Sequence, residues 1–183
     1  WQVVTKEMRR AAKAINFGIL YGQGPHGLSQ GAGISYSQAK DFIDRYFEVY
    51  PGIKKMMDKF IADARNKGYA ETLFGRRRPL PDLNADFIQV RHAAERMAIN
   101  MPIQGTAADM IKKAMLNIDD YIQDKKNDIR LLLQVHDELI FEIKSDKLEK
   151  YIEPLKKLMA EALPLSVPII VEAASGQNWG ELK

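Results

Sequence analysis

The chain has 183 residues, of which 46% are hydrophobic and none is cysteine, so it can form a folded core but no disulfide or thiolate metal site. Residues 1–118 carry 18 Lys/Arg against 11 Asp/Glu, and residues 119–183 carry 9 against 13. This asymmetry predicts a polyanionic partner for the basic part, unless its charges are ordinary solvated helix faces. The absence of a signal peptide and of an apolar run of about 18 residues predicts a cytoplasmic chain without a membrane partner.

The first predicted helix covers about residues 5–21 and carries cations and aromatic rings in one file. The file consists of Arg9, Lys13, Phe17 and Tyr21. Residues four apart lie above one another on a helix, and Gly22 followed by Pro25 marks its end. Arg and Lys bind phosphates and an aromatic ring can stack on a base, so the file could bind a nucleoside triphosphate. Alternatively, the two rings belong to the core and the two cations to a solvated face.

The next segments predict two more helices and a pair of extended pieces. One helix begins after Ser35, which stands in capping-box spacing with Gln38, and another covers about residues 52–67 before Gly68. The stretch YAETLFGRRRPLP predicts two short extended pieces around its Phe-Gly pair, because its prolines exclude a helix. Its three consecutive arginines, which end with Arg78, are weak candidates for a phosphate contact.

Helical periodicity resumes over about residues 86–100, and we expect Pro102 to interrupt it before a second helix that ends near residue 123. Arg96, Asn100 and Gln104 step by four along this stretch. Their long polar side chains could donate hydrogen bonds to the minor-groove acceptors that all base pairs share. Alternatively, they form a polar surface stripe beside the N-terminus of the second helix.

The C-terminal part predicts a hairpin, a helix over residues 146–162 and a final strand over residues 167–173. The strands IRLLLQV and LIFEI flank His136, Asp137 and Glu138. Asp137, helped by Glu138, could bind Mg²⁺ through oxygen ligands, or the charges could mark an exposed turn. Metal-assisted phosphoryl transfer usually needs further carboxylates, and we find no second aspartate in a similar strand. Helices with a small antiparallel sheet make the predicted fold class α+β.

Four stretches together carry a resemblance that covers essentially the whole chain. They are RRAAKAINFGILYG, ETLFGRRRPLPD, ERMAINMPIQGTAADMIKKAM and QVHDELIFE. In this order they resemble the C-terminal part of family A DNA polymerases, of the bacterial DNA polymerase I type. The resemblance implies a right-hand polymerase fold with mostly helical fingers at residues 1–83 and a C-terminal palm portion at residues 84–183. The upstream palm, thumb and exonuclease regions would be absent, and the start at Trp1 also suggests an excised fragment.

The same resemblance implies a role for each candidate residue in template-directed DNA synthesis during replication and repair. The incoming dNTP would bind to Arg9, Lys13, Phe17 and Tyr21, with Lys13 also protonating the pyrophosphate. The primer–template DNA would contact Arg78, Arg96, Asn100, Gln104 and His136. Two Mg²⁺ ions in the complete enzyme would be held in part by Asp137, with Glu138 in support.

The family's first catalytic aspartate has no counterpart in the sequence, so we expect this chain to be inactive without the remainder of the polymerase chain. Two alternatives stay open. The chain could be a non-catalytic nucleic-acid-binding module or one half of a split polymerase. It could also be a metal-dependent nuclease or phosphatase that uses His136, Asp137 and Glu138.

Overall fold

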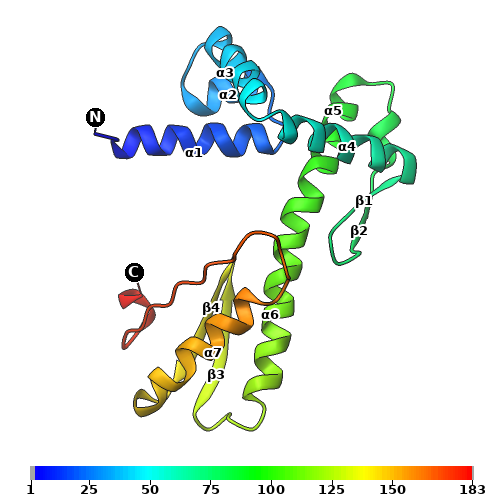
Figure 1. Ribbon diagram of the computed structural model, residues 1–183. Helices are drawn as coiled ribbons and strands as arrows, with labels where there is room; N and C mark the ends of the chain where they lie inside the picture. The colour runs from blue at the N-terminus through cyan, green and yellow to red at the C-terminus, as the bar shows by residue number, and fades with distance from the viewer. Residues whose placement is uncertain (1–2, 183) are drawn as a thin grey trace. The chain divides into compact units, whose positions relative to one another are not determined.

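The computed structural model describes residues 3–182, and the chain divides into two compact units, Trp1–Gly105 and Thr106–Lys183. Among the described residues, helices prevail and the strands form two antiparallel two-stranded sheets (Figure 1). The α+β class predicted from the sequence is therefore confirmed. No helix within residues 3–182 is long and apolar enough to cross a membrane.

The first unit begins with three helices around one core. They are α1 (Lys6–Leu20), α2 (Pro25–Ala32) and α3 (Tyr36–Val49). The hydroxyl of Thr5 caps α1 by accepting a hydrogen bond from the Met8 amide at 3.1 Å, as the predicted start of the helix requires. The shared core contains Ile15, Ile19, Leu28 and Ala39.

Helix α2 was not predicted. Its short sequence, PHGLSQGA, holds two glycines and a proline, which argue against a helix in isolation. Pro25, however, occupies the first turn, where a helix does not need the missing amide hydrogen. Burial of Leu28 against α1 and α3 then stabilises the segment.

A second core of this unit lies between α4 (Pro51–Lys67), a small hairpin and α5 (Ile88–Asn100). Helix α4 ends at Gly68 with φ +79°, as predicted. The hairpin pairs β1 (Tyr69–Glu71) with β2 (Arg77–Pro79), which confirms the two extended pieces expected there. A 3₁₀ turn, Pro81–Asn84, leads to α5 and buries Leu83.

The expectation that Pro102 interrupts the α-helix is confirmed, since α5 ends at Asn100 and the next α-helix begins at Thr106. Residues Met101–Gly105 form a π-helical turn between α5 and α6 (Thr106–Ile122), so the conformation stays helical across the proline. A π turn replaces the regular hydrogen-bond ladder locally, and the missing N–H of proline is tolerated there.

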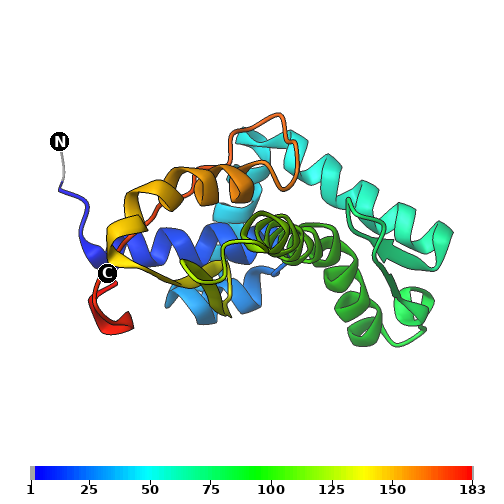
Figure 2. The same ribbon diagram turned by 90° about the horizontal axis from the view of Figure 1, so that it is seen from below.

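The second unit packs α6 and α7 (Leu148–Ala160) against the hairpin of β3 (Ile129–Val135) and β4 (Glu138–Ile143) (Figure 2). Its core contains Ile118, Ile122, Ile129, Tyr151 and Leu155. A one-residue shift in the pairing, between Leu131↔Phe141 and Leu133↔Ile140, leaves Leu132 as the extra residue. This bulge moves Leu133 away from the core face that Leu131 occupies, and the Leu133 side chain is accordingly half exposed.

The final strand predicted over residues 167–173 was wrong, since these residues adopt no regular structure. The segment has no ladder partner in the part of the chain that the structure describes. Val167 is 63% exposed and Ile170 is 83% exposed. A β-strand needs a neighbour for its amide and carbonyl groups, so an apolar run alone does not produce one.

Candidate functional site

The predicted file on α1 lies on the face opposite to the buried Ile15 and Ile19. Arg9, Lys13 and Phe17 are exposed, Phe17 by 45%, and Tyr21 is partly buried. The Phe17 and Tyr21 rings stack with centroids 5.8 Å apart, and Lys13 Nζ lies 5.8 Å from the centroid of the Phe17 ring. The alternative that Phe17 is a core residue is therefore wrong.

The C-terminal end of this file lies against α5. Gly22 has φ +74°, and a β-carbon at this position would lie 3.0 Å from Ile99 Cδ1 and 3.4 Å from Arg96 Cγ. The fold thus brings the Tyr21 end of the file next to Arg96, which is exposed. Only a residue without a side chain permits this approach together with a positive φ.

Asn100 and Gln104 follow Arg96 at the end of α5 and in the π turn. Gln104 is exposed, whereas Asn100 Oδ1 is buried and has no hydrogen-bond partner within residues 3–182. A buried carbonyl oxygen without a donor is uncommon and calls for a partner. The spacing predicted three hydrogen-bonding groups here, but it could not show that one of them is an unpaired acceptor.

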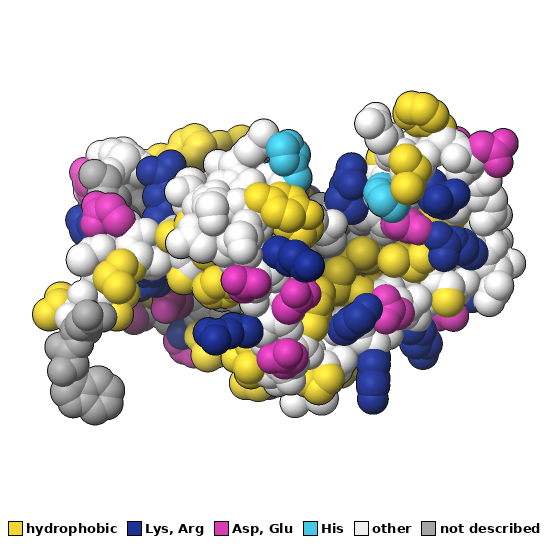
Figure 3. Space-filling view, turned by 90° about the horizontal axis from the view of Figure 1, so that it is seen from above, with side chains coloured by type: hydrophobic (Ala, Val, Ile, Leu, Met, Phe, Trp, Pro, Cys, Tyr) yellow, Lys and Arg dark blue, Asp and Glu magenta, His cyan; other side chains and the backbone are white. Residues whose placement is uncertain are grey.

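The arginine run lies on the β1–β2 hairpin with its side chains exposed. Arg77 Nε donates to Glu71 Oε1 at 3.0 Å, and its guanidinium carbon lies 4.7 Å from the centroid of the Tyr69 ring. The bond to Glu71 raises the pKa of Arg77. Arg78 is paired with Ala70 across the hairpin. In Figure 3, Lys and Arg side chains alternate with acidic and hydrophobic ones rather than forming one uniform positive surface.

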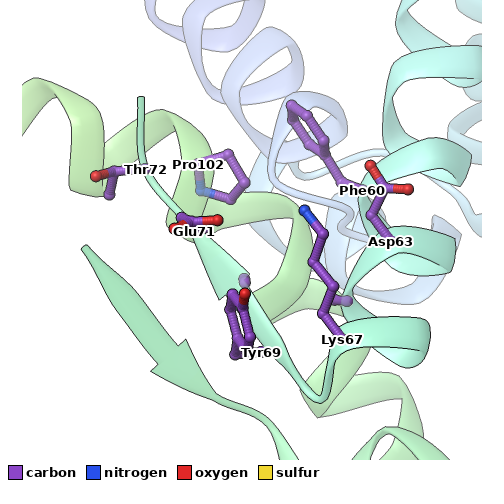
Figure 4. A pocket seen from close by; sticks show the side chains of 9 residues that line it. Phe60, Asp63, Lys67, Tyr69, Glu71, Thr72 and Pro102 are labelled. Carbon is purple, nitrogen blue, oxygen red and sulfur yellow. The ribbon is translucent and has the colours of Figure 1, made fainter. Parts of the chain in front are cut away.

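A small pocket of about 150 Å³ adjoins the hairpin and was not predicted. Figure 4 shows Phe60, Asp63 and Lys67 approaching it from α4, and Tyr69 and Glu71 from β1, with Pro102 of the π turn at its border. Nucleotide-sized ligands usually occupy clefts of about 300–1,000 Å³. The pocket is therefore too small for a nucleotide, and its lining residues carried no recognisable sequence motif.

His136, Asp137 and Glu138 form the tip of the β3–β4 hairpin in the second unit, and all three are exposed. Glu138 pairs with Val135, so His136 and Asp137 alone make the turn. His136 has φ +54°, which such a two-residue turn requires at its first position. Gln134 Nε2 donates to the His136 carbonyl oxygen at 2.7 Å and holds the tip.

The chemistry of this tip suits part of a magnesium site. Carboxylate oxygens are ligands that Mg²⁺ prefers, and Asp137 and Glu138 supply two carboxylates. In the described part of the chain, however, no three His, Cys, Asp or Glu side chains gather in a way that could hold a metal ion. The tip therefore fits a partial set of ligands and does not form a complete metal site.

Comparison with known proteins identifies the family. The family model described as DNA polymerase family A matches residues 1–181. The chain belongs to DNA polymerase family A. It is 47% identical over 178 residues to DNA polymerase I of Pseudomonas aeruginosa and 48% identical over 181 residues to the thermostable DNA polymerase I of Thermus filiformis. These matches cover 97% and 99% of this chain but 20% and 22% of the relatives.

A solved structure of this family also resembles the chain closely. It is the POL domain of Pol1 from M. smegmatis in complex with DNA primer-template and dNTP, with a TM-score of 0.92 and 42% identity. The match covers 98% of this chain and 32% of that one. The family resemblance drawn from the sequence is thus confirmed. The roles of single residues and the boundary between fingers and palm at residues 83 and 84 stay predictions.

Proposed function

We propose that this family A chain carries the nucleotide-binding helix and part of the metal site of a template-directed DNA polymerase. The observation that supports it most is the α1 file, in which Arg9, Lys13 and Phe17 are exposed and the Phe17 ring stacks on the partly buried Tyr21 beside Arg96. The solved relative, which binds primer-template and dNTP, has the same fold over 98% of this chain. The proposal covers replication and repair of DNA and a cytoplasmic location.

In this proposal, Arg9 and Lys13 bind the triphosphate and Phe17 and Tyr21 face the base. A cation beside the phosphates stabilises the negative charge that develops on the leaving group. Lys13 also has a proton to donate to the departing pyrophosphate. Nucleotidyl transfer depends mainly on positioning and charge neutralisation, and one helix face that presents two cations four residues apart supports both.

Arg78, Arg96, Asn100, Gln104 and His136 would contact the primer–template DNA. Arginine binds backbone phosphates in any sequence, and the polar groups of Asn100 and Gln104 suit the edges of bases in the minor groove. We assign residues 1–83 to the fingers and residues 84–183 to the palm as part of the same proposal.

Asp137 would hold Mg²⁺ with support from Glu138, and the further ligands would come from the remainder of the polymerase chain. Bound Mg²⁺ would supply charge neutralisation at the transferred phosphate. The hairpin keeps the Asp137 carboxylate exposed at a fixed turn, where an incoming ion can reach it.

Primer extension with Mg²⁺ tests this proposal. The 183-residue chain would be assayed alone and joined to the preceding portion of the Thermus filiformis enzyme, each with Asp137→Ala and with Asp119→Ala as an exposed control. We expect extension only from the joined protein, lost with Asp137→Ala and kept with Asp119→Ala. A folded joined protein that binds DNA and dNTP but extends nothing would contradict the proposal. Degradation of DNA without nucleotides would favour a nuclease, and DNA binding without either reaction would favour a binding module.

A further inference from the structure

Thr72 closes the turn from which the arginine strand β2 begins. Its side chain is only 5% exposed, and its hydroxyl accepts hydrogen bonds from the amides of Phe74 and Arg76, both at 3.2 Å. Its own amide donates to the Arg76 carbonyl oxygen at 2.9 Å, and its carbonyl oxygen accepts from the Gly75 amide at 3.0 Å. One residue therefore fixes both ends of the turn and the direction in which β2 leaves it.

The methyl group of the same side chain contacts the π turn. A β-carbon built on Gly105 would lie 2.6 Å from Thr72 Cγ2 and 3.1 Å from Met101 Sδ, so a side chain at position 105 cannot be accommodated without a shift. Figure 4 shows Thr72 at the end of β1, with Pro102 of the π turn also at the pocket.

The two contacts of Thr72 depend on each other. Rotation about its Cα–Cβ bond would move the methyl away from Gly105 but would also take the hydroxyl away from the two amides. The two amides would then lose the acceptor that the turn provides, which is unfavourable. Thr72 therefore holds the hairpin at one distance from the π turn that carries Gln104.

We propose that Thr72 is a positioning residue for DNA binding: together with Gly105 it sets the spacing between Arg78 on the hairpin and Asn100 and Gln104 on the helix. This inference rests on the proposed function. Thr72 is buried and acts through these neighbours. Thr72 would thereby keep a constant distance between the phosphate that Arg78 contacts and the base edges that Asn100 and Gln104 contact.

Fluorescence anisotropy of a labelled primer–template over a salt series tests the inference with Thr72→Val, Thr72→Ser and Gly105→Ala. We expect Thr72→Val to weaken binding by about fivefold, the effect of one net hydrogen bond. It should also lower the slope of log affinity against log salt by about one, because one phosphate contact is misplaced. Gly105→Ala should act in the same direction from the other side of the contact, and Thr72→Ser, which keeps the hydroxyl, should stay closer to the parent.

Two comparisons separate positioning from a general loss of structure. Thr72→Val combined with Arg78→Ala should bind no more weakly than Arg78→Ala alone, because both act through the same contact. Ser29→Ala, which removes a hydroxyl bonded to the His26 carbonyl oxygen within α2, should leave affinity and slope unchanged. Amide exchange of residues 73–77 should speed up in Thr72→Val and not in Ser29→Ala.

The outcomes distinguish the inference from the proposed function. If Arg78→Ala weakens binding while Thr72→Val and Gly105→Ala keep the parent's affinity and salt slope, the inference alone is wrong. If the parent chain does not bind primer–template DNA, or Arg78→Ala and Arg96→Ala both leave binding unchanged, the proposed function fails and the inference fails with it.

Discussion

On α1, the four-residue spacing places a cation against an aromatic ring. Lys13 Nζ lies over the Phe17 ring, which in turn stacks on Tyr21. Such a contact restrains the long lysine side chain by about 0.5–1 kcal/mol at an exposed site, so less conformational entropy is lost when the ammonium meets a phosphate. The ring is in this way both a stacking surface and a support for Lys13.

Replacing Lys13 with alanine should weaken dNTP binding by roughly one to two orders of magnitude, the effect of losing a charge-assisted hydrogen bond of about 1.5–3 kcal/mol. Calorimetric titration with dATP and Mg²⁺ in the joined protein measures this loss. Lys40→Ala, which removes an exposed cation on α3, is the matched control and should leave binding unchanged. Equal affinity in the two variants would contradict phosphate binding by the α1 file.

At the scale of elements, α3 shows how local sequence sets a helix boundary. The Ser35 hydroxyl accepts from the Gln38 amide at 3.2 Å, and the Gln38 side chain accepts from the Ser35 amide at 2.9 Å. Both donors are backbone amides that have no backbone acceptor at the start of a helix and would otherwise be unpaired. The start of α3 is therefore specified by contacts within its own first turn.

Ser35→Ala should lower the free energy of unfolding by about 0.5–2 kcal/mol, because the Gln38 amide loses its acceptor. Urea denaturation followed by circular dichroism measures the change. Ser37→Ala is a close control: this exposed serine lies within the helix, where alanine is the better helix former. A Ser35 variant as stable as the Ser37 variant would show that the cap contributes nothing.

The entry to β3 should make stability depend on pH. Lys144 Nζ lies 3.1 Å from Asp128 Oδ1, and this hydrogen bond is the main reason that the pKa of Asp128 lies below its usual 3.8. A carboxyl whose pKa is lowered by folding stabilises the protein at every pH above the pKa that this carboxyl has in the unfolded chain. This contribution is lost as the pH falls through the pKa that the carboxyl has in the folded chain. Acid should therefore weaken the second unit at this point.

Between pH 7 and pH 3 the parent chain should lose more stability than Asp128→Asn, which cannot ionise at this position. Urea denaturation at several pH values gives both curves. Ser37→Ala, which removes no titratable group from α3, should keep the pH dependence of the parent. Identical curves for the Asp128 variant and the parent would rule out this coupling.

At the scale of the whole molecule, the hydrophobic cores are separate. Leu28 and Ile118 are both nearly inaccessible, but Leu28 belongs to the core of α1 to α3 and Ile118 to the core of the second unit. Stability of the chain is therefore distributed over local cores, each of which can open with its own free energy.

Ile118→Ala should destabilise by roughly 2–5 kcal/mol and speed amide exchange mainly in residues 106–160. Leu28→Ala should speed exchange mainly in residues 6–49. Each variant is the control for the other, and amide hydrogen exchange followed by mass spectrometry measures the protection of both segments. If either variant alone speeded amide exchange equally in residues 6–49 and in residues 106–160, the chain would have one cooperative core instead.

Much of the fold follows from local signals in the sequence. The Thr5 and Ser35 caps, the Gly68 terminus and the short β1–β2 hairpin all depend on residues within a few positions of one another. The same is true of the α1 file, because helical spacing alone places its side chains on one face. Family membership followed from four sequence stretches in combination, from the α1 file to the His136–Glu138 tip, since each one alone also had a purely structural explanation.

The features that the sequence did not predict depend on long-range packing. Helix α2 is stabilised by the burial of Leu28 in the core that it shares with α1 and α3. The π turn accommodates Pro102 within a helical stretch. Residues 167–173 are largely apolar, as in a buried strand, but have no strand beside them in the described chain. The contact between Thr72 and Gly105 joins residues more than thirty positions apart, and no periodicity could reveal it.

The two-residue turn at the tip of the β3–β4 hairpin has a consequence for evolution and engineering. Side chains alternate between the faces of a sheet, so one inserted or deleted residue in either strand would move all the side chains beyond it to the opposite face. The bulge at Leu132 already makes one such change of face, which turns Leu133 away from the core. Length variation in this hairpin should therefore be selected against, and its history should consist of substitutions at constant length. Peptide tags or fused domains belong elsewhere, at exposed loops such as the one between α7 and the C-terminal end.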